Sequence, residues 1–173
     1  MPSPFSYPKM LRVLLAHQVD FVVIGGVCAT LHGSSVLTAD VDIVASRHSD
    51  NLKRLEAALT ELNAYYREHP RGRFLPDAER LDTKGHHLLM TDLGALDVLG
   101  TVTGGRGYEE LLPETIQFTI EGDLQIPMLN LPMLILLKQE TNRVKDRLIV
   151  PILRQLLLEK QEGTNKENAD SEN

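Results

Sequence analysis

The chain alternates between segments whose apolar residues recur at helical spacing and shorter, continuous apolar runs. Helical spacing predicts one short helix over 27–32 and longer helices over 7–18, 51–62, 132–139 and 143–160. Apolar runs bounded by turn residues predict strands over 21–25, 39–45, 87–90, 95–99, 115–120 and 124–128. This order of elements predicts an α/β (α+β) protein whose mixed sheet is flanked by helices and followed by a C-terminal helical segment.

Turn residues and polar stretches separate the predicted helices and strands. The segments Thr91–Gly94 and Glu121–Asp123 have hairpin length and each joins two predicted strands. The polar stretch over 65–85 predicts a loop with room for one short strand, and 161–173 has no periodicity, so we expect it to be disordered. The prediction is a single domain over 1–160 with a disordered polar tail over 161–173.

Three aspartates interrupt predicted strands. Asp40 and Asp42 lie in one apolar run and Asp97 lies in another. Side chains at i and i+2 of a strand point to the same face, so Asp40 and Asp42 would be neighbours. Neighbouring carboxylates repel each other and are costly to bury unless a cation lies between them. The pair alone also fits a strand end or a turn, but the third carboxylate favours a divalent metal site.

Composition narrows the class of protein. Apolar residues make up 42% and charged residues 24% of 173 residues, values typical of a globular protein with one core. One cysteine excludes an internal disulfide framework and a cysteine-based zinc site. No run has the length of a membrane span and the first residues lack the pattern of a signal peptide, so the expected location is cytoplasmic, without membrane contact.

Charge is unevenly distributed. The net charge is −6, and the segment from Glu159 to Asn173 holds five acidic and two basic residues. This balance argues against extended nucleic-acid binding but allows contact with one nucleotide or an RNA end. Lys138 and Lys145 are seven residues apart and would share a face if one helix continued through Glu140-Thr-Asn142, a segment that can also break it. They would then serve either to neutralise phosphate or as a solvated basic stripe.

The order Gly25-Gly26, thirteen residues, Asp40-Val-Asp42 and a later Asp97 resembles the signature of the nucleotidyltransferase superfamily, and within it the compact AbiEii-type and minimal nucleotidyltransferases. Thr38 and the segment from Lys138 to Asp146 add to this resemblance, which covers about 21–148. The chain departs from the pattern at Val36, where the family often has a basic residue.

The resemblance implies a nucleotidyltransferase-like sheet and transfer of a nucleoside monophosphate from a nucleoside triphosphate such as ATP to an acceptor hydroxyl on RNA, a protein or a small molecule. It implies that Asp40, Asp42 and Asp97 are catalytic and hold two Mg²⁺ ions. Nucleotide binding is implied for Gly25 and Gly26, which would bring backbone close to the triphosphate, and for Lys138 and Lys145. A tight strand-to-helix turn is the plainer explanation of the two glycines.

Two further hypotheses compete with an active enzyme. The chain can belong to a two-gene toxin–antitoxin or defence system, with a cognate partner protein. Alternatively, it can be a catalytically degenerate, antitoxin-like module that binds a nucleotide or a partner; Val36 favours this hypothesis and the complete acidic triad opposes it. A dinucleotide-binding domain is excluded because Gly25-Gly26 is not a G-x-G-x-x-G motif.

Overall fold

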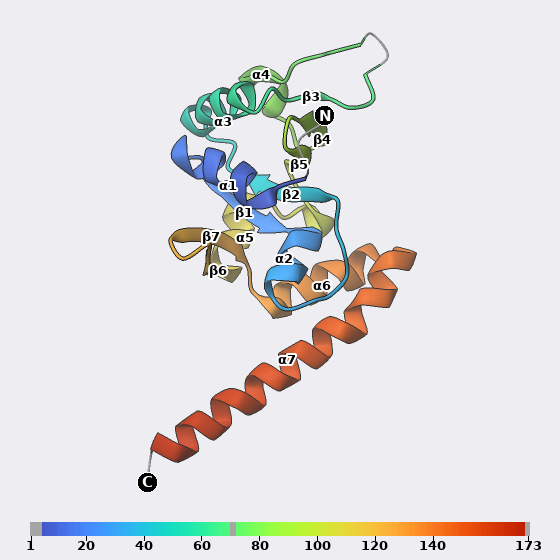
Figure 1. Cartoon of the computed structure of the whole chain (residues 1–173). Coiled ribbons are helices and arrows are strands. Elements are labelled where there is room, and N and C mark those ends of the chain that lie inside the picture. Colours follow the sequence, from blue (N-terminus) through green and yellow to red (C-terminus); the bar gives the residue numbers. More distant parts are fainter. Residues whose placement is uncertain (1–4, 70–71, 172–173) are drawn as a thin grey trace.

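The computed structural model describes residues 5–69 and 72–171, with side chains up to Thr164 (Figure 1). The strands are β1 (Phe21–Ile24), β2 (Asp40–Ala45), β3 (Tyr65–Tyr66), β4 (His86–Thr91), β5 (Gly94–Leu99), β6 (Thr115–Ile120) and β7 (Leu124–Leu129). The α-helices are α1 (Tyr7–Ala16), α2 (Gly25–Leu31), α3 (Ser49–Glu61), α4 (Ala78–Leu81), α5 (Tyr108–Leu111), α6 (Leu131–Thr141) and α7 (Val144–Ser171). Two 3₁₀ turns are η1 (Thr103–Gly105) and η2 (Leu112–Glu114).

One mixed sheet organises the fold, as the sequence predicted. Its strands follow the order β3-β4-β5-β2-β1-β7-β6. Parallel pairs join β2 to β5 and β1 to β7, whereas the remaining neighbours are antiparallel. Both predicted hairpins are present, as β4–β5 and β6–β7. Strand β2 is central, so residues on it are held from both sides.

The apolar residues that predicted the elements form the core. The stripe on α3 is buried at Leu52, Leu55 and Leu59, which fixes this helix against the rest of the domain. On β2 the exposed fractions of Val41 and Ile43 are both 0%. These two residues alternate with the aspartates, so β2 has one apolar face and one acidic face.

Some boundaries differ from the prediction. Helix α2 begins at Gly25 rather than Val27, because the positive φ of Gly25 lets the chain turn directly out of β1. Helix α3 begins at Ser49, two residues before the predicted start, and His48 is its N-cap, so Ser49 and Asp50 lie in its first turn. Asp50 still lies where a carboxylate favours the helix dipole.

The last helix is longer than the pattern predicted. Helix α7 continues to Ser171 and enters the segment that was expected to be disordered. That segment contains glutamate, lysine and glutamine, which are good helix formers and need no apolar stripe to extend an existing helix. In Figure 1, α7 runs past the sheet and ends well away from the body of the domain. No helix within the described residues has the length and apolar content to cross a membrane.

A break separates α6 from α7. Asn142 adopts the left-handed conformation, with φ of 51°, and ends α6. Asparagine tolerates this conformation better than other residues with a side chain. Lys138 and Lys145 therefore lie on different helices, and the condition of one continuous helix is not met.

Candidate active site

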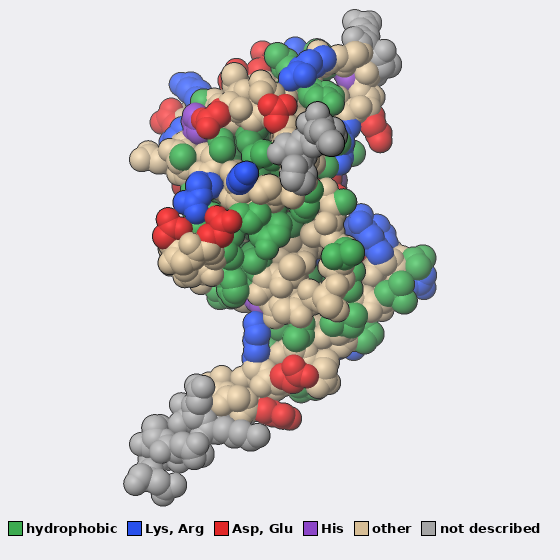
Figure 2. Space-filling model, in the orientation of Figure 1, with side chains coloured by type: hydrophobic (Ala, Val, Ile, Leu, Met, Phe, Trp, Pro, Cys, Tyr) green, Lys and Arg blue, Asp and Glu red, His purple; other side chains and the backbone are tan. Residues whose placement is uncertain are grey.

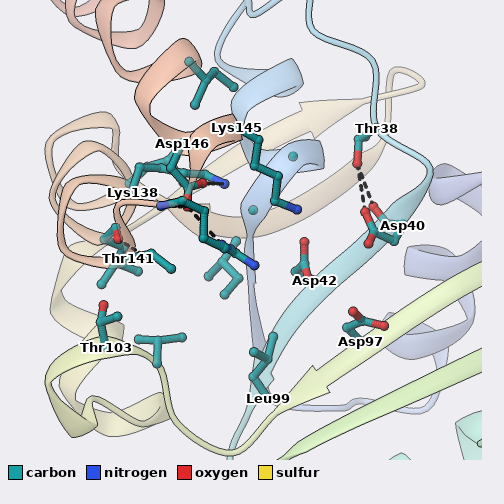
Figure 3. A pocket seen from close by; sticks show the side chains of 18 of the residues that line it. Thr38, Asp40, Asp42, Asp97, Leu99, Thr103, Lys138, Thr141, Lys145 and Asp146 are labelled. Carbon is teal, nitrogen blue, oxygen red and sulfur yellow. Dashed lines mark hydrogen bonds and ion pairs between the residues drawn. The ribbon is translucent and has the colours of Figure 1, made fainter. Parts of the chain in front are cut away.

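The three aspartates lie on adjacent parallel strands. Asp42 on β2 pairs with Asp97 on β5, and Asp40 pairs with Ala95 in the same register. Directly paired residues share a sheet face, so all three carboxylates point the same way (Figure 3). One oxygen from each can be chosen so that all three lie within 4.8 Å of one another. The convergence predicted from the i, i+2 spacing and the separate Asp97 strand is confirmed.

Their proximity and burial disfavour the charged forms of Asp42 and Asp97. Burial, followed by the charges of Asp40 and Asp97, raises the pKa of Asp42 to about 6. Burial also raises the pKa of Asp97, although Arg67 opposes that change. A cation between the carboxylates would relieve both effects, and carboxylate oxygens are the ligands that Mg²⁺ prefers. The donor set therefore fits a divalent metal ion.

Thr38 orients the first of these aspartates. Its hydroxyl lies 3.1 Å from Oδ1 of Asp40 and donates to it, and it lies 3.1 Å from the backbone oxygen of the same residue (Figure 3). Thr38 belongs to the loop between α2 and β2, which is otherwise free of regular structure. This threonine fixes Asp40 at the point where the strand begins.

The two glycines are required by the site itself. A Cβ on Gly25 would collide with the carboxylate of Asp42, and a Cβ on Gly26 would lie 2.5 Å from Oγ1 of Thr38. Both residues line the cavity beside the aspartates. We expected the missing side chains to leave space for phosphate, but the structure provides a nearer reason, which is close packing against Asp42 and Thr38. A role in nucleotide binding stays a prediction.

A cationic cluster forms where α6 meets α7. Nζ of Lys138 lies 3.0 Å from Oδ1 of Asp146, and Nε of Arg143 lies 3.0 Å from Oδ2. Asp146 has an exposed fraction of 0%. Burial alone would raise the pKa of Asp146, but the hydrogen bonds from Lys138 and Arg143 hold it below its ordinary value. Lys138 is thus held by a buried partner rather than solvated.

Lys145 differs from Lys138. It extends from the first turn of α7 into the cavity, on the side of Asp42 (Figure 3). Its side chain makes no hydrogen bond or ion pair with the side chains that the structure describes, but its charge opposes the rise in the pKa of Asp42 and of Asp97. The cavity measures about 500 Å³, and its walls include all seven residues that the sequence singled out: Gly25, Gly26, Asp40, Asp42, Asp97, Lys138 and Lys145.

The sequence analysis did not predict the roles of two residues of the site, Arg67 and Asp146. Nη2 of Arg67 lies 2.5 Å from Oδ1 of Asp97. Arg67 follows the short strand β3, at the far edge of the sheet, and no motif in the sequence marks it. Asp146 was noted only as the end of a segment that adds to the resemblance. A carboxylate three residues after Arg143, at the start of a predicted helix, was an available signal for its backbone-capping role.

Comparison with known proteins extends the description of the fold. No family model and no curated protein sequence matches the chain. Among solved structures, the chain is similar to the lincosamide antibiotic adenylyltransferase LnuA, whose crystal structure has lincomycin bound. The two sequences are 13% identical and the TM-score is 0.60. The match covers 88% of this chain and 98% of LnuA. A candidate nucleotidyltransferase from Thermotoga maritima is 18% identical with a TM-score of 0.48, over 94% and 90% of the two chains. The chain has a nucleotidyltransferase-like fold.

Proposed function

We propose that this protein is a metal-dependent nucleotidyltransferase that moves a nucleoside monophosphate from a nucleoside triphosphate to an acceptor hydroxyl. The observation that carries the proposal is the convergence of Asp40, Asp42 and Asp97 within one cavity that also receives Lys145. Carboxylates and a free cation facing one cavity suit a substrate that combines a polyphosphate with metal ions. The likeness of fold to an adenylyltransferase supports the same class of reaction.

The aspartates are assigned to magnesium. Asp40 and Asp42 would hold two Mg²⁺ ions and Asp97 would complete the ligand set. When bound, such ions neutralise the charge on the attacking and leaving oxygens of an in-line displacement. Thr38 keeps Asp40 in position, and the packing of Gly25 against Asp42 fixes the second carboxylate.

The remaining groups handle substrate. Lys145 neutralises the triphosphate, with Lys138 and Arg143 adding positive potential behind it. Asp97 takes the proton of the acceptor hydroxyl. The acceptor oxygen then bonds to the α-phosphorus, the bond from that phosphorus to the bridging oxygen breaks, and pyrophosphate leaves with the electron pair. The cavity is too small for a folded macromolecule, so an RNA or protein acceptor would insert only its reacting end.

Transfer of label tests the proposal. Each of the four nucleoside triphosphates, labelled on the α-phosphate, is incubated with the protein, Mg²⁺ and, separately, total RNA, total protein or a small-molecule extract. The proposal requires label in at least one acceptor fraction and none with the Asp42→Asn variant. Absence of transfer under all conditions, with a folded protein that binds metal, would contradict it. ATP as donor, a cognate partner in a toxin–antitoxin system and a cytoplasmic location stay proposals attached to this activity.

A binding module without catalysis is the second candidate. Its specific support is that Arg67 already neutralises Asp97, the proposed base, and that Val36 places no cation on the loop before Asp40. Such a module would bind a nucleotide or a partner protein but transfer nothing. Equal nucleotide affinity with and without Mg²⁺ would favour it, because the ligand would then lie away from the carboxylates.

A further inference from the structure

The three carboxylates of the acidic triad are held by different kinds of contact. Asp40 accepts a hydrogen bond from the hydroxyl of Thr38, and Asp42 packs closely against backbone. The contact to Asp97 is the guanidinium of Arg67, with 2.5 Å between Nη2 and Oδ1, and it therefore carries a charge. A charged partner affects both the direction of a carboxylate and the net charge around it.

The register of the sheet places Arg67 in line with the triad. The pairing of β3 with β4 continues by one residue, because the backbone N–H of Arg67 donates to the carbonyl of Leu88, 3.0 Å away. Leu88 pairs with Asp97 on β5, and Asp97 pairs with Asp42 on β2. Directly paired residues share a sheet face, so these four residues form one row across the sheet. Neighbouring strands lie about 4.8 Å apart, so a long side chain is needed to reach over β4 to Asp97.

Side-chain contacts fix the end of β3 from which Arg67 extends. The hydroxyl of Tyr66 lies 2.8 Å from Nδ1 of the buried His87, and Nε2 of this histidine lies 3.1 Å from Oγ1 of Thr83. The backbone N–H of Tyr66 donates to the carbonyl of Phe74 at 2.9 Å. A strand of only two residues is thereby held in place, and Arg67 extends from a defined backbone position.

Arg67 lies beside the cavity rather than in its wall. The described residues that line the cavity include Asp97 and Leu88 but not Arg67. Figure 2 shows Lys and Arg side chains where α7 begins, well away from the part of the domain that carries β3, so Arg67 is separate from that basic region. The side chains of Arg67 and Asp97 are 23% and 12% exposed, which limits screening of their contact by solvent. A substrate in the cavity would meet Asp97, and Arg67 would act through it.

We propose that Arg67 is a positioning residue, which holds Asp97 in the direction of the metal site and offsets one of the three negative charges of the triad. Its guanidinium engages Oδ1 of Asp97, so Oδ2 is the oxygen left to face a metal ion. A fixed ligand suits the strict geometry that Mg²⁺ demands, and the offset charge lowers the affinity of the triad for the ion. This role rests on the proposed function, because the ion is the Mg²⁺ that transfer would use.

Calorimetric titration of the full chain with Mg²⁺ at pH 8, without nucleotide, tests the charge. Arg67→Met keeps a long unbranched side chain but removes the cation. We expect it to bind Mg²⁺ about tenfold more tightly, because the ion then meets three carboxylates without the opposing guanidinium. Arg67→Lys keeps the charge and should bind Mg²⁺ within about threefold of the wild-type affinity.

Arg73→Met is the matched control, since it removes an arginine from the same segment of the chain. The guanidinium of Arg73 donates to the carbonyl of Asn63 at 3.0 Å and lies 4.8 Å from the ring centre of Tyr65. Its loss should leave the affinity for Mg²⁺ unchanged. Circular dichroism and thermal unfolding verify that all three variants fold. Unchanged or weaker Mg²⁺ binding by folded Arg67→Met, or an equal change in Arg73→Met, would overturn the proposal.

Transfer rates at saturating Mg²⁺ test the positioning. Arg67→Met should lower kcat by about tenfold or more, because Asp97 is no longer held, and should leave the KM for nucleoside triphosphate unchanged, because Arg67 does not line the cavity. Arg67→Lys should recover part of kcat, since an ammonium can approach Asp97 but lacks the planar donor pair.

Tighter metal binding together with slower transfer is the expected signature, and a purely structural role would instead weaken both. A wild-type kcat in Arg67→Met would contradict the positioning of Asp97. A wild-type chain that transfers nothing would count against the proposed function, and the Mg²⁺ titration would still decide whether Arg67 offsets the charge of the triad.

Discussion

The two walls of the cavity are built from different kinds of structure. The acidic wall is made of carboxylates on β2 and β5, whose register is fixed by continuous backbone pairing from Asp40 to Val44. The basic wall is made of side chains on α6 and α7, which meet at the left-handed residue Asn142. Strand register alone positions the carboxylates, whereas the basic side chains are positioned by a turn between two helices and by the buried carboxylate of Asp146. Backbone pairing thus orders one wall of the cavity and side-chain contacts order the other.

The walls also differ in how their charge is balanced. Like charges face each other on the acidic wall, and burial together with this repulsion raises the pKa of Asp42. On the basic wall, Asp146 accepts hydrogen bonds from both Lys138 and Arg143. A bound cation would therefore relieve the acidic wall, whereas the basic wall contains a carboxylate of its own. Lys145, in contrast, faces the cavity without a direct ion-pair partner among the described residues and can meet a substrate.

Removing Asp42 should have the largest effect on transfer. We expect Asp42→Asn to reduce the transfer rate by about 10³-fold or more, because the proposed metal ligand that faces both other carboxylates is lost. Thermal unfolding should show an intact or slightly more stable fold, since repulsion is relieved. Asp50→Asn is the control, because that carboxylate is 83% exposed and lies on α3. Wild-type turnover in Asp42→Asn would refute the metal role, and a badly unfolded variant would indicate a structural carboxylate.

The two lysines should separate into a functional and a structural residue. Lys145→Ala should lower transfer by about 10²-fold with unchanged stability, because it removes the uncompensated cation. Lys138→Ala should lower the free energy of unfolding by about 3 kcal/mol, because it removes a partner of a buried carboxylate. Rates and denaturant unfolding of both variants give the comparison. Equal losses of stability would mean that Lys145 also serves the fold.

The pH dependence of stability should reveal the burial and the repulsion of Asp42 on the acidic wall. Because the pKa of Asp42 is raised to about 6 from 3.8, folding favours its protonated form. The stability that this group contributes is complete below about pH 4 and is lost as the pH rises through about 6, a difference of roughly 3 kcal/mol. The Asp42→Asn variant should lack this loss when unfolding is followed in EDTA. Identical pH profiles of variant and wild type would contradict the assignment.

Mg²⁺ should strengthen the binding of a nucleoside triphosphate between the two walls of the cavity. We expect nucleoside triphosphate to bind at least about tenfold more tightly with Mg²⁺ than with EDTA, because bare carboxylates repel a polyanion and bound metal reverses that sign. Calorimetric titration under both conditions measures the ratio. In Asp42→Asn the ratio should fall towards one. A wild-type ratio of one would favour the binding module.

Thr38 should have the smallest effect. Thr38→Val keeps the shape of the side chain but removes the hydroxyl that donates to Asp40. The loss of one hydrogen bond to a charged group, about 1 kcal/mol, should weaken Mg²⁺ binding by a factor of roughly five. Thr60→Val is the control, because its hydroxyl bonds only the backbone of its own helix. A larger effect on folding than on metal affinity would show that Thr38 serves the loop rather than the site.

The acidic wall was predictable from the sequence because strand geometry is local. Asp40 and Asp42 share a face by alternation, and one further strand sufficed to bring in Asp97. The fold was predictable for a similar reason, since each apolar run marked its own strand. The pairing of Arg67 with Asp97 was not, because it joins residues that the topology of the sheet brings together and no repeating pattern connects.

The basic wall was predictable only in composition. Its lysines were identified from the sequence, but the directions of their side chains depend on the turn at Asn142. The sequence indicated a break there without fixing the angle between the two helices. The length of α7 was underestimated because its last part has no apolar stripe and its helical state follows from propensity. The reason for Gly25 and Gly26 was also hidden, because the packing of Asp42 and Thr38 against them involves another strand and a loop.

Asp146 has a consequence for how the domain opens. Besides pairing with two cations, its carboxylate accepts from the backbone N–H of Arg143, at 3.3 Å, and so closes the first turn of α7. Fraying of that turn would release the helix amide, Lys138 and Arg143 in one step. We therefore expect cooperative local opening at this end, in which the amide hydrogens of Arg143, bonded to Asp146, and Arg147, bonded to the carbonyl of Arg143, exchange with solvent together.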